Sequence, residues 1–199
     1  MYIRVYDYQD GVRKLGPGTR FVIWTQGCGR HCKGCMTPQS QDMDGGKEMD
    51  VRDLAAMILR SGRDGITISG GEPFLQAAEL SELIGLLKAR RDIGVIVYTG
   101  FTIEEIREKK DPGMNRFLDQ IDLLVDGPYI EEMNDGRNLR GSANQRAIAL
   151  TERYERNVPD YGSRKAEIEL FAKEDRIVLV GVPDAKTLAR FQQAFEEET

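Results

Sequence analysis

Short apolar segments alternate with amphipathic segments along the first two thirds of this sequence. Four segments are rich in β-branched or aromatic residues, as buried strands are, and they are residues 20–25, 65–69, 95–98 and 121–125. The intervening segments carry apolar residues at helical spacing, and they are residues 51–59, residues 75–90 and a segment that begins at Thr102. This alternation predicts βαβ units around a parallel sheet.

Two of the predicted helices begin at capping residues. Asp50 precedes the first helix, and Thr102 and Glu105 have the spacing of a capping box, in which each side chain accepts a hydrogen bond from the other residue's backbone. Beyond residue 150 the pattern loosens. Residues 166–173 and 176–182 indicate a β-hairpin, and residues 185–196 indicate a helix.

The chain of 199 residues has 40% hydrophobic and 31% charged residues, which is ordinary for one globular domain. We predict an α/β fold, a partial (βα) barrel with a small C-terminal hairpin, turning at Glu174 and Asp175, and a helix. A single domain is expected over residues 1–199. Its core would span about residues 19–150 and a C-terminal extension about residues 151–199.

The predicted strands end in glycines and polar residues. The segments that follow the four strands are the cysteine-containing loop and residues 69–73, 99–100 and 126–128. Because the carboxyl ends of parallel strands meet at one edge of a sheet, we expect these four segments to converge there and to form a ligand site.

All three cysteines, Cys28, Cys32 and Cys35, lie within eight residues. An odd, clustered set is a poor disulfide framework but a good metal site in a reducing compartment. Three thiolates can hold three irons of a 4Fe-4S cube, which leaves the fourth iron without a protein ligand. That iron could chelate the amino and carboxyl groups of S-adenosylmethionine (SAM). Reduction would then break the S–C5′ bond and give methionine and a 5′-deoxyadenosyl radical.

A zinc site is the alternative reading of the cysteines, with His31 as a fourth ligand. His31 is adjacent to Cys32 on a tight loop, where two neighbouring side chains rarely reach one metal, so the spacing favours an iron–sulfur cluster. The turn Gly70, Gly71, Glu72 and Pro73 strengthens this preference, because glycines let the backbone approach a ligand closely.

The cysteine loop and the glycine-rich turn, in this order, resemble the radical SAM superfamily. Within it the chain resembles the activases of glycyl radical enzymes, especially those of anaerobic ribonucleotide reductase. The motifs that carry the likeness are residues 27–35, 69–73, 98–100, 126–128 and 140–145. By this resemblance the fold is a partial barrel of the radical SAM type. The chain would be an oxidoreductase with a 4Fe-4S cluster and SAM as cofactors.

The resemblance also implies which residues contact SAM. Gly34, Cys35 and Met36 would line it, Gly71 would bond its methionyl amine region, and Asp126 would lie near the sugar or the substrate. The full predicted set is Gly34, Cys35, Met36, Gly70, Gly71, Glu72, Pro73, Thr99 and Asp126, with Cys28, Cys32 and Cys35 as the metal ligands and catalytic residues.

The chain departs from the family at two places. Gly34 stands where the superfamily often has an aromatic residue, and the chain runs longer than the compact activases after about Ala149. The residues expected to flank the site and to dock a partner are residues 129–135 and 137–141.

The expected substrate is a glycine Cα–H on a large glycyl radical enzyme, with a flavodoxin- or ferredoxin-like protein as electron donor. A net charge of −5 and a pI near 5.1 disfavour nucleic acid as a partner. No apolar run approaches the ~20 residues that cross a bilayer, and residues 1–11 lack the apolar core of a signal peptide. We therefore expect a cytoplasmic protein without membrane contact.

Two other functions stay open at this level. A radical SAM enzyme of similar length could modify a small molecule or a peptide. A non-catalytic zinc or iron–sulfur protein would need the cysteines but would have no clear use for residues 70–73.

Overall fold

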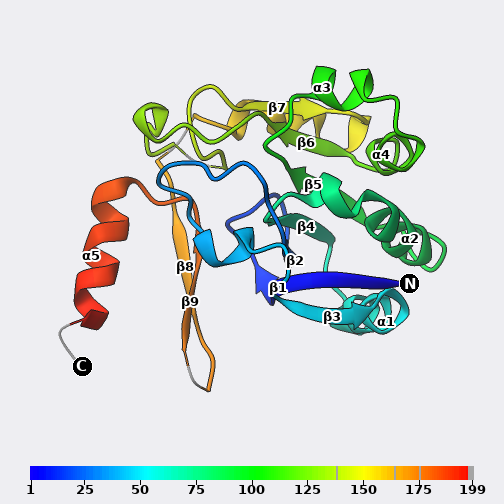
Figure 1. The fold of residues 1–199 in the computed structure, drawn as a ribbon, viewed down its shortest axis with the longest axis horizontal. Helices are drawn as coiled ribbons and strands as arrows, with labels where there is room; N and C mark the ends of the chain where they lie inside the picture. The colour runs from blue at the N-terminus through cyan, green and yellow to red at the C-terminus, as the bar shows by residue number, and fades with distance from the viewer. Residues whose placement is uncertain (138, 164, 175, 197–199) are drawn as a thin grey trace.

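The computed structural model describes residues 1–137, 139–163, 165–174 and 176–196. Its centre is a seven-stranded sheet in the order β3-β1-β2-β4-β5-β6-β7 (Figure 1). Four neighbouring strands are parallel: β2 (Arg20–Thr25), β4 (Gly65–Gly70), β5 (Gly94–Tyr98) and β6 (Leu123–Asp126). The flanking antiparallel strands are β1 (Tyr2–Val12), β3 (Lys47–Asp50) and β7 (Arg146–Ala149).

The sheet confirms the predicted α/β class and the four predicted parallel strands. Within the described residues it is open, because β3 and β7 are its two edges and do not pair with each other. The carboxyl ends of β2, β4, β5 and β6 lie at one edge of the parallel ladder, which is where ligands collect in folds of this kind.

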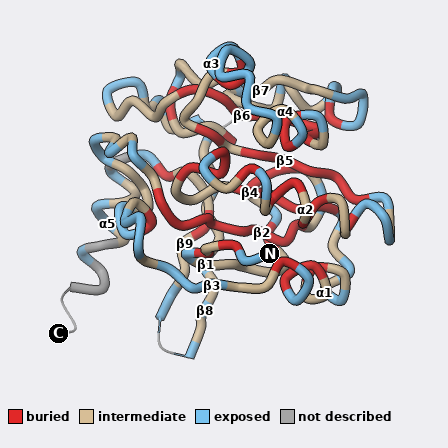
Figure 2. Tube along the Cα trace, turned by 45° about the vertical axis from the view of Figure 1, so that its right-hand side comes forward, coloured by how far each residue is buried: buried red, intermediate tan, exposed pale blue. Residues whose placement is uncertain are grey.

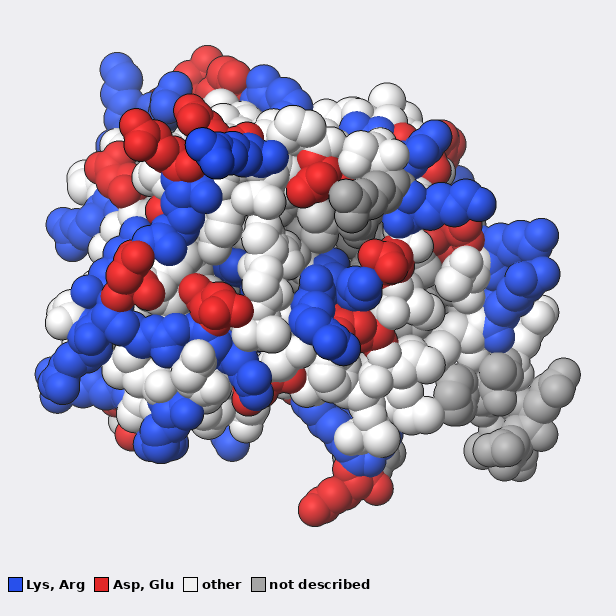
Figure 3. All heavy atoms as spheres, turned by 180° about the vertical axis from the view of Figure 1, so that it is seen from behind, with Lys and Arg blue, Asp and Glu red and all other residues white. Residues whose placement is uncertain are grey.

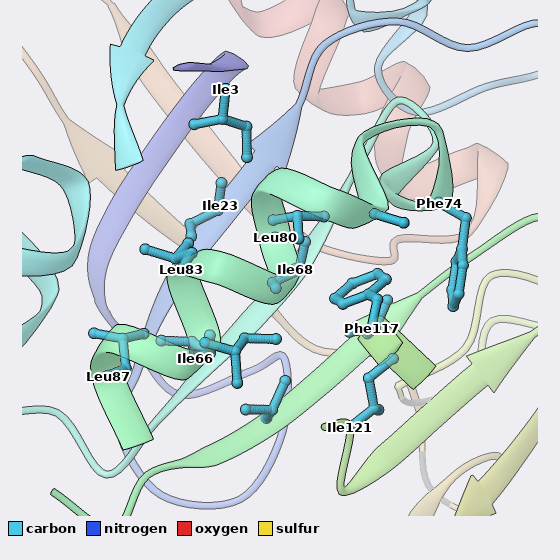
Figure 4. Close-up of a cluster of buried hydrophobic side chains, with 14 of the residues drawn as sticks. Ile3, Ile23, Ile66, Ile68, Phe74, Leu80, Leu83, Leu87, Phe117 and Ile121 are labelled. Carbon is cyan, nitrogen blue, oxygen red and sulfur yellow. The ribbon is translucent and has the colours of Figure 1, made fainter. Parts of the chain in front are cut away.

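One face of the sheet is covered by helices, which carry the main hydrophobic core. Figure 1 shows them on the right of the sheet: α1 (Val51–Ser61), α2 (Ala77–Lys88) and α4 (Pro112–Leu118), with the short α3 (Ile103–Glu108) near β7. Figure 4 shows isoleucines of the strands meeting Leu80, Leu83 and Leu87 of α2 and Phe117 of α4. Figure 2 shows the same central strands as the most buried part of the trace.

The predicted caps are present at both helix starts. The Asp50 side chain accepts a hydrogen bond from Arg52 N, and Thr102 and Glu105 form the reciprocal capping box. The helix expected from residue 75 begins differently. Pro73 opens a 3-10 turn, η2 (Pro73–Gln76), which Glu72 caps, and α2 follows at Ala77.

The C-terminal extension covers the opposite face of the sheet. It consists of η4 (Glu152–Asp160), β8 (Ile168–Ala172), β9 (Ile177–Gly181) and α5 (Ala185–Glu196). The predicted hairpin and terminal helix are therefore confirmed, although Asp175 of the predicted turn lies outside the described residues. Val178 and Val180 of β9 pack near Val22 and Trp24 of β2.

A separate part of the extension packs on β5 and β6. Tyr154 of η4 joins the buried residues Ile96, Leu123 and Val125. The extension therefore lies over the sheet face that the helices leave uncovered. No helix among the described residues combines the length and the apolar character needed to span a membrane.

Candidate functional site

A cavity of about 420 Å³ lies at the carboxyl ends of the parallel strands. The structure brings three of the predicted segments together in its wall: the cysteine loop, the glycine-rich turn after β4 and the end of β5. The predicted site residues that line this cavity are Cys28, Cys32, Cys35, Met36, Gly70, Gly71, Glu72 and Thr99. Gly127, after β6, completes the convergence of four strand ends that the sequence predicts.

The backbone of the cysteine loop is tied at both of its ends. Gly27 N donates to Ser40 O at 2.8 Å, Cys28 N donates to Gln41 O at 3.1 Å, and Cys35 N donates to Cys32 O at 3.2 Å. The first two bonds hold the two ends of the loop together beyond the end of β2. All three cysteines are free thiols of intermediate exposure, so their sulfur atoms are available as ligands.

The donor set fits an iron–sulfur cube. Burial raises the pKa of the Cys28 thiol, and the nearby backbone N–H of Arg30 opposes the rise. Within the described residues, no three His, Cys, Asp or Glu side chains gather closely enough to surround a single ion. A cube spreads its cysteine ligands over separate irons, so they need not converge on one point.

The glycine-rich turn packs against the cysteine loop at backbone contact distance. Glu72 N donates to Gly27 O at 2.8 Å. A Cβ on Gly71 would lie 2.3 Å from Gly27 O and 2.9 Å from Ser40 O, which no side chain tolerates. The glycine at position 71 is therefore required for the close approach of the two motifs.

Glu72 joins the ends of β4 and β5 inside the wall. Its side chain is 2% exposed and accepts hydrogen bonds from Thr99 Oγ1 at 2.7 Å and Gly100 N at 2.8 Å. Burial raises the pKa of Glu72, and these hydrogen bonds act against the rise. The glutamate of the motif thus fixes the relative position of two segments that line the cavity.

Comparison with known proteins agrees with this geometry. A family described as a 4Fe-4S single cluster domain matches residues 14–148, more than half of the chain. The chain belongs to this family. An anaerobic ribonucleoside-triphosphate reductase-activating protein of Vibrio cholerae is 35% identical over 140 residues, covering 65% of this chain and 87% of that protein. The protein of that name from Enterobacteria phage T4 is 29% identical over 143 residues, covering 69% and 88%.

A third relative is named for a different enzyme. The pyruvate formate-lyase 1-activating enzyme of Escherichia coli K12 is 29% identical over 153 residues, covering 73% of this chain and 59% of that enzyme. These matches confirm the resemblance to radical SAM activases and the expectation of an oxidoreductase enzyme. The family's cofactor is an iron–sulfur cluster rather than the zinc ion that the cysteine spacing leaves open.

Three residues that were predicted to contact SAM do not line the cavity: Gly34, Pro73 and Asp126. Asp126 is fully buried, and its carboxylate accepts hydrogen bonds from Ile103 N at 2.8 Å and Arg146 Nε at 2.9 Å. It therefore ties the end of β6 to α3 and β7. Contact of these three residues with SAM stays a prediction.

His31 does not join the cysteines in the cavity wall. Its exposed ring lies 3.1 Å, Nδ1 to Oε1, from the Gln41 side chain. His31 is therefore a polar residue of the loop surface, in agreement with the preference for an iron–sulfur cluster over a zinc site with His31 as a ligand.

Several parts of the wall were not predicted from the sequence, among them residues 6–7 and 39–41. Arg30, on the cysteine loop, lines the cavity, and so does a stretch of the C-terminal extension: Arg176, Ile177, Val178, Leu179, Gly181, Val182, Leu188 and Phe191. Of the segments expected to flank the site, Tyr129 and Gly141 line it, while Asn138 lies outside the described residues. The apolar character of β9 is apparent in the sequence, but its place in the cavity wall is not.

Proposed function

We propose that this enzyme reductively cleaves SAM and uses the resulting radical to take a hydrogen atom from a glycine of a partner enzyme. One electron enters the SAM sulfonium, and the S–C5′ bond breaks to give methionine and a 5′-deoxyadenosyl radical. That radical takes the glycine Cα hydrogen, so the products are 5′-deoxyadenosine and a glycyl radical.

One observation carries the proposal: the three cysteines and the glycine-rich turn line the same cavity. Cys28, Cys32 and Cys35 would hold the cluster, which when bound supplies the electron and an open coordination position. Gly70 and Gly71 line the cavity and would present backbone N–H and C=O groups to a methionine moiety. Thr99 and Glu72 would keep this wall in place.

The partner is inferred from the relatives. The relatives are named for anaerobic ribonucleoside-triphosphate reductase and for pyruvate formate-lyase. The match spans 87% and 88% of the two relatives named for the reductase, but 59% of the pyruvate formate-lyase activating enzyme. We therefore propose an anaerobic ribonucleotide reductase as the partner of this chain. A flexible glycine loop of that enzyme would enter the cavity beside Tyr129 and β9.

Other parts of the proposal concern the setting of the enzyme. We take the open sheet as a partial barrel and the whole chain as one domain, with a flavodoxin- or ferredoxin-like electron donor in the cytoplasm. Figure 3 shows basic and acidic side chains interspersed over one face of the molecule. That face therefore has no extended region of one charge that would attract a partner of high opposite charge.

The test is electron paramagnetic resonance of the partner. The reconstituted enzyme, SAM and dithionite are mixed anaerobically with an anaerobic ribonucleotide reductase from the same organism. The proposal predicts a glycyl radical signal that is absent with the Cys32→Ala enzyme and with a partner whose target glycine is alanine. Formation of 5′-deoxyadenosine without any partner radical would overturn the partner and favour a small-molecule or peptide substrate.

A further inference from the structure

Arg30 is the side chain that connects the cysteine loop to the end of β5. It lies between Cys28 and Cys32 in sequence, yet its guanidinium stacks 4.5 Å above the centre of the Phe101 ring. Its Nη2 lies 3.3 Å from Glu105 Oε2 of α3, and the side chain is 25% exposed. A planar guanidinium can stack and donate hydrogen bonds at the same time, whereas a lysine ammonium cannot.

The space around Arg30 is closely fitted. A Cβ on Gly100 would lie 2.4 Å from Arg30 Cδ, so the aliphatic part of the Arg30 side chain packs directly on that glycine. The positive charge also acts on the buried Glu72 carboxylate, whose pKa it lowers against the larger effect of burial. Arg30 therefore packs against Gly100, which lies after β5 and lines the cavity.

The same residue lies in the wall of the cavity that the three cysteines line. Hydrogen bonds to ligand sulfurs and nearby positive charge favour the reduced form of an iron–sulfur cluster, because reduction adds negative charge. The Arg30 Nε–H is buried and has no hydrogen-bond partner among the described residues, so the cavity wall retains an unused donor.

We propose that Arg30 is a positioning residue for the cluster. Its side chain, fixed on Phe101 and Glu105, holds the cysteine loop against the segment after β5 and keeps a positive charge in the wall of the cavity that the three cysteines line. The inference rests on the proposed iron–sulfur site. It adds that Arg30 raises the reduction potential of that site and slows the loss of iron.

Lys33 provides a matched control on the same loop. It lies between Cys32 and Cys35, and its ammonium lies 2.9 Å from Glu131 Oε2 and 3.1 Å from Glu132 Oε1. Its side chain is 77% exposed and is not part of the cavity wall. Arg30→Met and Lys33→Met each remove one charge and one ion pair of the loop, but only Arg30→Met removes a charge from the cavity wall and the link between the cysteine loop and Phe101.

The experiment measures the midpoint potential of anaerobically reconstituted protein by a redox titration followed by electron paramagnetic resonance. We expect Arg30→Met to favour the oxidised form about tenfold, a fall of about 59 mV for one electron. Iron retention against a chelator should weaken about 10-fold. Lys33→Met should change neither quantity, and Arg30→Lys, which keeps charge but loses the stack, should fall between.

A second variant separates positioning from charge. Phe101→Leu keeps the guanidinium but removes its aromatic platform, and it should shift the potential in the same direction as Arg30→Met. Equal potentials and equal iron retention in Arg30→Met and Lys33→Met would overturn the inference. If the wild-type protein binds no cluster, the proposed function itself fails, and that outcome is visible before any variant is compared.

Discussion

The carboxylate of Glu72 and the hydroxyl of Thr99 form a 2.7 Å hydrogen bond that joins the carboxyl ends of β4 and β5. Both residues are buried, at 2% and 4% exposure. Since Thr99 also accepts a hydrogen bond from Phe101 N, its hydroxyl links the glycine-rich turn to the segment under Arg30. This bond fixes the position of the glycine-rich turn relative to the end of β5 in the cavity wall.

Loss of the Thr99 hydroxyl should therefore weaken the fold. We expect Thr99→Val to lower the free energy of unfolding by about 1–3 kcal/mol, because Glu72 and Phe101 N each lose a buried partner. Thr99→Ser keeps the hydroxyl and should recover most of the loss. Denaturant unfolding of the apoprotein measures both variants, and equal stability of Thr99→Val and the wild type would contradict the role given to this bond.

The contact between the glycine-rich turn and the cysteine loop gives a steric prediction. Gly71→Ala places a Cβ 2.3 Å from Gly27 O and should cost about 1–3 kcal/mol, with loss of bound iron. Gly29→Ala is the control on the cysteine loop, because a Cβ there meets nothing within 4 Å. Iron content after reconstitution and unfolding by denaturant report the two effects, and wild-type behaviour of Gly71→Ala would refute the close packing.

The four parallel strands can be predicted from the sequence because each is an apolar run buried on both faces. The antiparallel flanks are harder. β3 is the polar tetrapeptide KEMD, and β7 has four residues, so their strand conformation depends on pairing with β1 and β6. β1 alternates buried Ile3 and Val5 with exposed or half-buried residues, a strand pattern that was not assigned from the sequence.

Only the parts of the site that are formed by residues close together in the sequence can be predicted from it. The cysteine loop and the turn at Gly71 carry their own local signals. Asp126 shows the limit, because a polar residue at a strand end can serve a ligand or the fold, and here it bonds Arg146 and Ile103 N. The wall from the C-terminal extension depends on distant contacts, such as the 2.8 Å ion pair of Asp7 with Lys173.

The Glu104–Arg146 pair gives a pH prediction. The two side chains approach to 2.7 Å, and the hydrogen bond from Arg146 lowers the pKa of Glu104 from 4.5 to about 2. Because the folded pKa lies below the unfolded one, the pair stabilises the fold above pH 4.5, and this contribution is lost as the pH falls toward 2.

Glu104→Gln isolates that contribution. The wild-type apoprotein should be the more stable of the two near neutral pH, and the difference should shrink as the pH falls through the acid range. Since both side chains are largely exposed, added salt should also reduce the difference. Chemical unfolding at several pH values measures it. A difference that does not change with pH would contradict the pairing.

The hairpin gives a prediction about the proposed partner. Ile177 and Leu170 are exposed apolar residues on its two strands, at 43% and 54%, but only Ile177 lines the cavity. Ile177→Asp should lower the yield of partner radical about tenfold, while formation of 5′-deoxyadenosine without partner is unchanged. Leu170→Asp is the control and should retain the full yield. Equal losses in both variants would exclude a specific role for the cavity wall.

The central claim is tested most directly by anaerobic reconstitution with iron and sulfide, reduction by dithionite with SAM, and chromatography for 5′-deoxyadenosine. The account predicts 5′-deoxyadenosine from the wild type and none from Cys28→Ala, Cys32→Ala or Cys35→Ala, each with its fold retained by circular dichroism. Stoichiometric zinc binding without SAM cleavage by the wild-type protein would contradict it.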